Sequence, residues 1–271
     1  MADIHRWPGL TIVIPAYNER NRLPRTLNEL ERYRARFNGP FEVIVVDDGS
    51  VDDTAALVRC RANALPWLSV LPCPHRGKGA AVRSGMLAAR HPWVVLCDAD
   101  LSMPVDELDL FLAALDDGCQ VAIGSRALPE SRRYHQPLRR RLMSHVFSLL
   151  VRALVVPGIK DTQCGFKGFQ RDVARELFSL GRLEGFGFDV EIIFLAHKYG
   201  YRLREVPITW YFDADSRVRA IADTVDMAVD LLRIRYRGTR GHYRRAAPPR
   251  MAAEDHALDL DIAAVERAVG N

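Results

Sequence analysis

The feature that most constrains the fold of this chain is a unit of apolar strand, polar loop and helix that occurs four times in its N-terminal half. The strands are short apolar runs, predicted over residues 10–14, 41–46, 68–71 and 93–97. Buried parallel strands read as continuous apolar runs, and a helix usually connects neighbouring ones. The repeated unit therefore predicts an α/β fold with a mostly parallel sheet flanked by helices, and a fifth strand over residues 121–123 extends it.

Polar loops follow these strands at residues 15–19, 47–50, 76–79 and 98–100. In a parallel α/β sheet, ligands bind at the carboxyl ends of the strands, so the four loops are expected to meet at one edge. A single polar loop is an ordinary surface feature. Four such loops, acidic and basic together, favour a nucleotide site.

Asp98 and Asp100 are the strongest candidate metal ligands. Residues i and i+2 of an extended chain point the same way, so the two carboxylates lie together at the end of the fourth strand. Mg²⁺ or Mn²⁺ carrying a diphosphate suits such a pair, because Mg²⁺ is usually held by one or two carboxylates plus substrate phosphates. The chain has two more Asp-x-Asp pairs, Asp213/Asp215 and Asp259/Asp261. The first of these lacks accompanying nucleotide loops, and the apolar strand and loops before Asp98 favour the Asp98/Asp100 pair over both.

Two common phosphate-binding motifs are excluded by the residues present. A dinucleotide-binding G-x-G-x-x-G should follow the first strand, where this chain has Pro-Ala-Tyr-Asn-Glu. The segment Gly77-Lys78-Gly79 lacks the third glycine, because Val82 occupies that position. A P-loop needs Ser or Thr after its lysine, and here Gly79 follows Lys78.

Composition limits the partners and the location. The 271 residues carry a net charge of +4, but residues 233–250 hold seven Arg and no acid, while residues 251–271 hold five acids and one Arg. The remainder is near neutral, so nucleic-acid binding is not expected from the charge. Five cysteines without a C-x-x-C pair make zinc ligation and disulfides unexpected and favour a reducing cytosol. Without a run of about 18 apolar residues or an apolar N-terminal region, neither a membrane span nor a signal peptide is expected.

Several short motifs stand in a specific order: Ile-Pro-Ala-Tyr-Asn-Glu, Val-Val-Asp-Asp-Gly-Ser, Arg-Gly-Lys-Gly, Asp-Ala-Asp-Leu and Gly-Ser-Arg. Together they resemble the GT-A fold glycosyltransferases of family 2. The second half, with Asp-Thr-Gln-Cys-Gly-Phe-Lys at residues 161–167 and Phe-Asp-Val-Glu at 188–191, is similar to the dolichyl-phosphate glucosyltransferases and the related dolichyl-phosphate mannose synthases. The resemblance covers residues 9–237.

This resemblance implies one GT-A domain, a Rossmann-like nucleotide-diphospho-sugar transferase fold, over residues 1–237. Its nucleotide-sugar half would be residues 9–126 and its acceptor half residues 127–237. Residues 238–271 would form a tail that is first basic and then acidic.

The activity implied by the resemblance is inverting transfer of glucose from UDP-glucose to dolichyl or polyprenyl phosphate, with Mg²⁺ or Mn²⁺ as cofactor. Three alternatives stay open: a GDP-mannose-dependent synthase, a family 2 transferase with a soluble sugar acceptor, and a nucleotide-binding module without turnover. Intact Asp98, Asp100 and Asp161 argue against the last.

The resemblance also assigns roles to single residues. Those implied in nucleotide binding are Pro15, Tyr17, Glu19, Asp48, Ser50, Lys78 and Asp98. Asp48 would bind the base, and it is expected in a surface loop outside the core. The implied metal ligands are Asp98, Asp100 and Ser102, the last standing where mannose synthases often carry Gln. The implied catalytic residues are Asp161, Asp189 and Arg126, and the residues implied in holding the acceptor phosphate are Arg126, Arg139 and Lys167.

Charge and chemistry bear on the acceptor side too. Arginines cluster over residues 132–141, before an apolar segment at 142–156 that suits a core helix or a surface-lying one. With residues 233–250 they could dock the chain peripherally at the cytoplasmic face of a membrane, although solubilising or protein-binding roles also fit.

A phosphate acceptor is mostly a dianion at neutral pH and needs little general-base help. Asp161 and Asp189 are therefore expected to orient Lys and Arg side chains, and Asp189 could equally be an N-cap.

Overall fold

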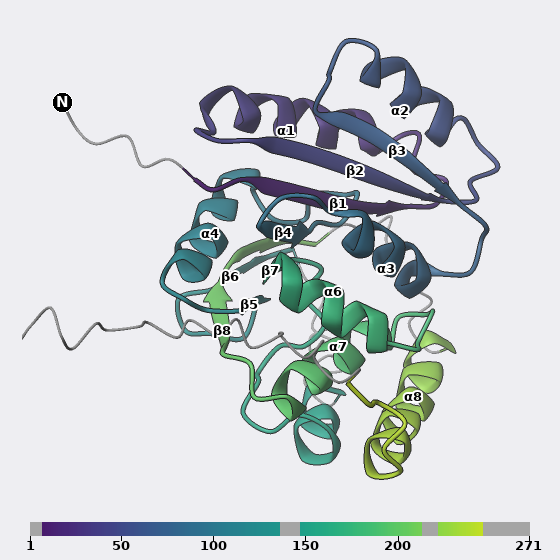
Figure 1. Ribbon diagram of the computed structural model, residues 1–271, viewed down its shortest axis with the longest axis vertical. Helices are drawn as coiled ribbons and strands as arrows, with labels where there is room; N and C mark the ends of the chain where they lie inside the picture. Colours follow the sequence, from purple (N-terminus) through teal and green to yellow (C-terminus); the bar gives the residue numbers. More distant parts are fainter. Residues whose placement is uncertain (1–6, 136–146, 213–221, 246–271) are drawn as a thin grey trace, which may run out of the picture.

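A seven-stranded sheet runs through the centre of the protein in the computed structural model, which describes residues 7–135, 147–212 and 222–245, without the side chains of 222–225 (Figure 1). Its strand order is β3-β2-β1-β4-β7-β5-β8. The strands are β1 (Leu10–Ala16), β2 (Phe41–Asp48), β3 (Leu68–Cys73), β4 (Trp93–Leu96), β5 (Val121–Ser125), β7 (Lys167–Gln170) and β8 (Leu203–Pro207). The five strands predicted in the N-terminal half are all present in this sheet.

The sheet is parallel except at β7, which is antiparallel to both of its neighbours, β4 and β5. The pairs β1–β2, β1–β4, β2–β3 and β5–β8 are all parallel, so the predicted mostly parallel α/β fold is confirmed. β7 itself was not predicted, because Lys-Gly-Phe-Gln is neither an apolar run nor an alternating one. This strand inserts the segment that follows Asp161 into the middle of the sheet.

Helices cover both faces of the sheet (Figure 1). One face packs against α1 (Leu23–Arg36), α2 (Thr54–Ala62) and α4 (Leu108–Asp116), which follows the short 3-10 helix η1 (Val105–Glu107). The other packs against α3 (Lys78–Ala88), α6 (Arg171–Leu180), α7 (Phe188–Lys198) and α8 (Ala222–Thr239). Because both faces are covered, the central strands are apolar on both sides, which explains their continuous apolar runs.

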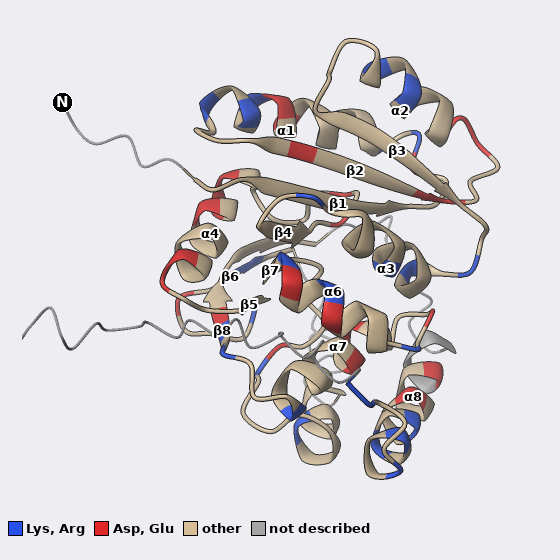
Figure 2. Cartoon of the chain, viewed as in Figure 1, with Lys and Arg blue, Asp and Glu red and all other residues tan. Residues whose placement is uncertain are grey.

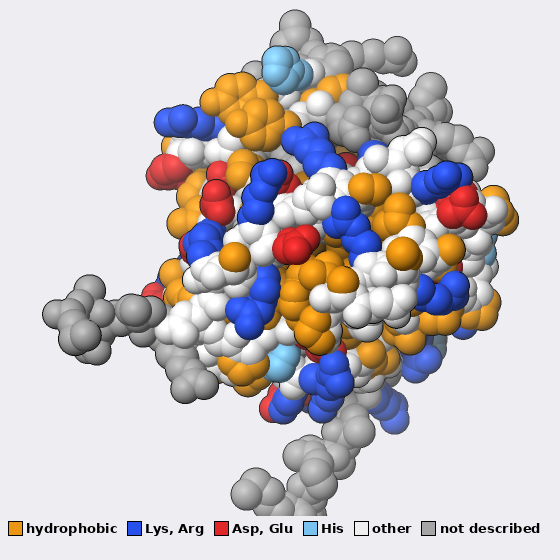
Figure 3. Space-filling model, turned by 90° about the horizontal axis from the view of Figure 1, so that it is seen from above, with side chains coloured by type: hydrophobic (Ala, Val, Ile, Leu, Met, Phe, Trp, Pro, Cys, Tyr) orange, Lys and Arg blue, Asp and Glu red, His pale blue; other side chains and the backbone are white. Residues whose placement is uncertain are grey.

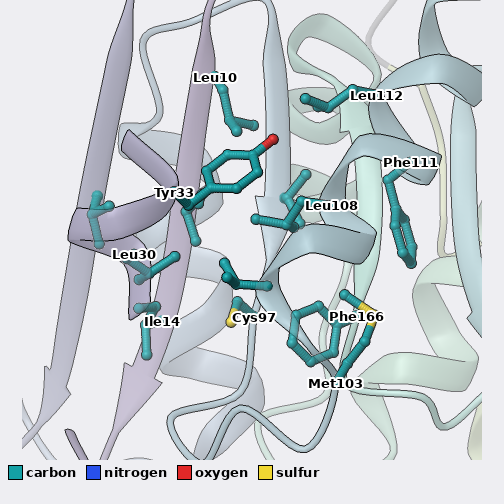
Figure 4. Packing of buried hydrophobic residues seen from close by; sticks show 14 of the residues in the cluster. Leu10, Ile14, Leu30, Tyr33, Cys97, Met103, Leu108, Phe111, Leu112 and Phe166 are labelled. Atoms are coloured by element: carbon teal, nitrogen blue, oxygen red, sulfur yellow. The ribbon is translucent and has the colours of Figure 1, made fainter. Parts of the chain in front are cut away.

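The alternation of side chains along β1 divides the core into two parts. Ile12 and Ile14 lie in the cluster on the α1 face, whereas Val13 lies in the cluster on the α3 face. Figure 4 shows the first cluster, in which Tyr33 of α1 and Phe111 of α4 converge with Phe166, the residue before β7. Residues far apart in the sequence therefore hold the start of β7 next to the end of β4.

The second half of the chain contains elements that the sequence did not predict. A second, two-stranded sheet pairs β6 (Arg132–Tyr134) with β9 (Thr209–Tyr211).

The apolar segment predicted at 142–156 as a core helix or a surface-lying one is helical over residues 147–154. Phe147 and Val151 are in the core, whereas Leu149, Leu150 and Leu154 are exposed. One side of this helix packs into the core, and the other side is exposed at the surface.

Helix α3 approaches the sheet closely at Gly85. A Cβ atom on Gly85 would lie 2.4 Å from Val13 Cγ1 and 2.7 Å from Val46 Cγ2, closer than van der Waals contact permits. The glycine therefore sets the distance between α3 and strands β1 and β2. This packing also fixes the N-terminus of α3, where Lys78 stands.

We predict that Gly85→Ala lowers the free energy of unfolding by about 1–3 kcal/mol, because overpacking outweighs the gain in helix propensity of about 1 kcal/mol. Urea unfolding measures the change. Leu87→Ala on the same helix is the control, since Leu87 is largely exposed and its truncation should change stability little. A Gly85→Ala protein as stable as the parent would contradict this account of the packing.

Candidate active site

The polar loops after β1, β2 and β3 are joined by hydrogen bonds at one edge of the sheet. The backbone N–H of Asn18 donates to Ser50 Oγ at 2.9 Å, and that of Glu19 donates to Thr54 Oγ1 at 2.8 Å. The Asp48 carboxylate accepts from the backbone N–H groups of Arg76 and Gly77, each at 3.0 Å. The loops therefore meet as predicted.

Asp48 differs from the expectation of a surface loop: it is the last residue of β2 and only 3% exposed. It is buried because its carboxylate anchors the loop that leads into α3.

The other residues predicted to border the nucleotide lie nearby: Pro15 is in β1, and Tyr17 directly follows this strand. The Glu19 carboxylate forms a bidentate ion pair with Arg22, whose Nε and Nη2 donate to it at 2.7 and 2.5 Å.

Three ion pairs form the centre of the site: the Lys167–Asp189 pair is buried, the Arg126–Asp161 pair is largely buried, and the Lys78–Asp98 pair is partly exposed. Lys78 Nζ lies 2.6 Å from Asp98 Oδ1, and Lys167 Nζ lies 2.6 Å from Asp189 Oδ1. Arg126 Nε and Nη2 donate to the two oxygens of Asp161 at 2.7 and 3.0 Å. The partners come from separate elements: α3 and the end of β4, β7 and the first turn of α7, and the loops after β5 and before β7.

These pairs interact with one another, and the pKa values reflect it. Burial opposes the charge of Lys78, but Asp98, Asp189 and Asp100 outweigh it and hold the pKa of Lys78 above its usual value. Burial likewise opposes ionisation of Asp98, but Lys78, Lys167 and Arg126 lower its pKa. At Asp189 burial dominates over Lys167 and Lys78, so its pKa is raised.

Asp100 completes the pair of carboxylates after β4. Burial first, and then the charge of Asp98, raise the pKa of Asp100. The backbone N–H of Ser102 donates to Asp100 Oδ1 at 3.1 Å, so Ser102 orients this carboxylate. On the other side, a Cβ atom on Gly165 would lie 1.6 Å from Asp98 Oδ2, so only glycine lets this loop pass next to Asp98.

The residues present fit a divalent cation that is shared with substrate. Burial is the main cause of the raised pKa of Asp100, and the neighbouring charge of Asp98 adds to it. A cation between the two carboxylates would relieve their mutual repulsion. Across the described part of the chain, no group of three or more His, Cys, Asp or Glu side chains could hold a metal ion by itself. Two carboxylates with open positions are what Mg²⁺ or Mn²⁺ needs when phosphate oxygens supply further ligands.

Comparison with known proteins now identifies the family. The model of the family described as "Glycosyl transferase family 2" matches residues 11–178, the segment that contains the β1–β4 loops, Asp98, Asp161 and Lys167. The chain belongs to glycosyl transferase family 2. Among curated family 2 relatives, it is 38% identical over 255 residues to the dolichyl-phosphate beta-glucosyltransferase of Drosophila melanogaster, covering 88% of this chain and 78% of the relative.

Other relatives carry the same name. The Dictyostelium discoideum protein is 33% identical over 251 residues, covering 87% of this chain and 76% of its own length. The Homo sapiens protein is 34% identical over 250 residues, covering 87% and 77%. Thus the similarity extends beyond the family model to most of the acceptor half.

Solved structures share the fold. Mannosyl-3-phosphoglycerate synthase from Rubrobacter xylanophilus aligns with a TM-score of 0.64 at 18% identity, covering 90% of this chain and 78% of its own. Glucosyl-3-phosphoglycerate synthase from Mycobacterium tuberculosis in complex with UDP aligns with a TM-score of 0.62 at 20% identity, covering 84% and 80%. The predicted GT-A fold is therefore confirmed.

The structure of this family 2 glycosyltransferase also shows two residues, Trp210 and Glu205, that contact the predicted site and that the sequence analysis missed. The Trp210 ring lies 5.2 Å from the Arg126 guanidinium carbon, and the Glu205 carboxylate accepts from the backbone N–H groups of Lys160 and Asp161 at 3.0 and 3.1 Å. Neither Trp210 nor Glu205 stands at a sequence spacing from Arg126 or Asp161 that would predict the contact. Only the folded chain brings them together. The aromatic run at 210–212 was the one available signal.

Several predicted residues cannot be placed in this site. Arg139, a predicted acceptor-phosphate residue, lies outside the described residues, as do Asp213, Asp215, Asp259 and Asp261. Lys167 is placed, but its Nζ donates to Asp189 and to the carbonyl of Cys164, and its side chain is 1% exposed. Contact between Lys167 and an acceptor phosphate stays a prediction.

The Asp161–Arg126 pair makes stability depend on pH at low pH. Burial opposes ionisation of Asp161, but the charge of Arg126 and the hydrogen bonds from it outweigh burial and lower the pKa of Asp161 to about 2. A carboxyl whose pKa is lower in the folded than in the unfolded state stabilises the fold above its unfolded pKa of about 3.9. That stabilisation is lost as the pH falls from about 4 to about 2.

We predict that Asp161→Asn lowers the free energy of unfolding at pH 7 by about 2–3 kcal/mol, because it leaves the largely buried Arg126 without its counter-charge. The variant should also lose stability less steeply than the parent between pH 4 and pH 2. Urea unfolding across this range tests both. Asp117→Asn is the control, since its pair with Arg204 is exposed and should contribute less than about 1 kcal/mol. Equal slopes for Asp161→Asn and the parent would contradict the assignment.

Proposed function

We propose that this family 2 glycosyltransferase moves glucose from UDP-glucose to a dolichyl or other polyprenyl phosphate, with inversion at the anomeric carbon. The observation that carries the proposal is that both candidate catalytic carboxylates are bound to cations, Asp161 to Arg126 and Asp189 to Lys167. A sugar hydroxyl acceptor needs a free carboxylate as general base, whereas a phosphate dianion is already a nucleophile. The names of the relatives, dolichyl-phosphate beta-glucosyltransferase, support the same acceptor and sugar.

The donor side would use the residues at the ends of β1, β2 and β4. Asp98 and Asp100 would hold Mg²⁺ or Mn²⁺, which supplies positive charge to the diphosphate leaving group when bound. Lys78, kept protonated by Asp98, adds a fixed positive charge at the same place. Solved neighbours in complex with Mn²⁺ and UDP are consistent with this assignment.

On the acceptor side, a phosphate oxygen attacks the anomeric carbon, the bond from that carbon to the diphosphate oxygen breaks, and UDP leaves with the bonding electron pair. Arg126 would attract the acceptor phosphate, since its guanidinium is held between the Asp161 carboxylate and the Trp210 ring. Asp161 therefore positions the cation and takes no proton. Asp189 has the same relation to Lys167.

An exposed apolar face near the acceptor half suits a lipid-linked substrate. It consists of one side of helix 147–154 and one stripe of α8: Leu149, Leu150, Leu154, Val229, Leu232 and Tyr236. The two helices are neighbours, because Arg235 Nη1 donates to the carbonyl of Leu154 at 3.4 Å. Arginines lie in the second part of α8 and aspartates in the first, as the blue and red segments at the lower right of Figure 2 show.

The residues around this apolar face favour docking at a membrane surface. Among the described helices, none is both long and apolar enough to cross a bilayer. Apolar side chains flanked by arginines instead suit an anionic leaflet, where each basic residue contributes about 1 kcal/mol. At the other end of the molecule, which Figure 3 shows from above, basic side chains are mixed with acidic and apolar ones.

We predict that Asp100→Ala abolishes glucosyl transfer and metal-dependent UDP binding. The loss should be at least about 100-fold, because the leaving group loses its charge stabilisation. The assay offers labelled UDP-glucose or GDP-mannose with polyprenyl phosphate or a soluble sugar. Asp172→Ala is the matched control, since Asp172 is an exposed carboxylate on α6. Near-normal turnover of Asp100→Ala would remove it from the site, and a parent protein without product from any pair would favour the non-catalytic module.

We predict that Leu232→Asp weakens binding to anionic liposomes by about tenfold or more, since a buried leucine contributes about 1.5–3 kcal/mol. Flotation with anionic and neutral liposomes across a salt series measures this. Leu110→Asp is the control, because Leu110 is also an exposed leucine but lies on α4, outside the docking face. If the parent floats with neither liposome and transfers glucose only to a soluble sugar, both the docking face and the lipid acceptor are wrong.

A further inference from the structure

The His75 side chain, which the proposed function does not use, lies flat on Tyr17. The two ring centroids are 4.1 Å apart and the ring planes are 17° from parallel. Tyr17 follows β1, whereas His75 stands in the loop between β3 and α3. The stack therefore joins two of the loops that meet at the edge of the sheet.

The same imidazole is hydrogen-bonded to Asp48. His75 Nδ1 lies 2.9 Å from the backbone carbonyl oxygen of Asp48 and 2.9 Å from its Oδ2. Both partners can only accept, so Nδ1 carries the proton and donates. The other two donors to this carboxylate are backbone N–H groups of Arg76 and Gly77, which cannot leave without moving the loop. The His75 ring can leave, because it is a side chain and is 55% exposed.

The distance between this stack and Asp98 decides whether a nucleotide bound at Asp98 can reach Tyr17 and Asp48. Strands β2, β1 and β4 are adjacent in the sheet, and Asp48, Tyr17 and Asp98 stand at or just after their carboxyl ends. Neighbouring strands are about 4.8 Å apart, so Asp48 lies about 10 Å along the edge from Asp98. If the diphosphate binds at Asp98 and Asp100, as the proposed function requires, a ribose and base directed toward β2 reach Tyr17 and Asp48.

A nucleobase such as uracil offers the same two features as the His75 ring: a flat face and a ring N–H that donates to a carboxylate. We propose that His75 occupies the nucleobase position on Tyr17 and Asp48 in the free protein, and that the donor must displace it. His75 would then lower the affinity for every nucleotide of this size. This inference rests on the proposed function for the location of the diphosphate.

The test measures binding of UDP with Mn²⁺ to the full-length protein by calorimetry. Loss of a stacked aromatic competitor predicts that His75→Ala binds UDP about fivefold to tenfold more tightly than the parent. Binding of inorganic pyrophosphate with Mn²⁺ should be unchanged, because pyrophosphate has no base to compete with His75. His75→Phe, which keeps a ring but not the N–H donor, should give a smaller gain than His75→Ala.

His197→Ala is the control, since His197 is an exposed histidine on α7 and its removal should change neither affinity. Unchanged UDP affinity of His75→Ala would overturn the inference, as would an equal gain for pyrophosphate. Weaker UDP binding by both His75→Ala and His75→Phe would also overturn it, because His75 would then be a ligand of the base. In these cases UDP still binds the parent and the proposed function stands. A parent that binds neither UDP nor any other nucleotide would instead refute the proposed function itself.

Discussion

Burial of charge is the constraint on which the rest of this structure depends. The centre of the site holds four carboxylates and three cations within the protein, namely Asp98, Asp100, Asp161, Asp189, Lys78, Lys167 and Arg126. An isolated buried charge is very unfavourable, so each must keep an opposite partner at close range. Asp100 is the member without a cation in direct contact among the ion pairs described. The surplus carboxylate suits a site that a divalent cation completes.

The architecture of the sheet supplies these partners. Parallel strands deliver Asp48 and Asp98 to one edge, while the antiparallel strand β7 enters from that edge and carries Lys167 at its start. Asp161 and Gly165 lie in the segment just before β7, so a single reversal of direction places the residues proposed for the acceptor side beside those proposed for the donor side. The tight fit of Gly165 against Asp98 shows how closely the two halves join. The N-terminus of α3 is fixed by a backbone hydrogen bond, in which the N–H of Gly79 donates to the carbonyl of Glu184 at 2.7 Å.

Much of the N-terminal half could be predicted because its signals are local. Apolar runs, their spacing and the loops after them identified β1 to β5, and the convergence of Asp48, Lys78 and Asp98 followed from parallel pairing. The second half gave weaker signals. β7 is four residues long and contains a lysine and a glycine, and β6 lies within an arginine-rich stretch, so neither has the periodicity of a strand. Helix α8 was not predicted either.

The sequence by itself determined the fold class, because strand periodicity depends only on neighbouring residues. It also identified Asp98 and Asp100 as a pair, although the two residues lie in the turn after β4 and not on the strand itself. It also carried the motifs that place the chain in family 2. Only the tertiary structure decided that Asp161 binds Arg126 and Asp189 binds Lys167, and that His75 covers Tyr17. These partners are tens of residues apart, and which opposite charge meets which depends on packing that no local pattern encodes.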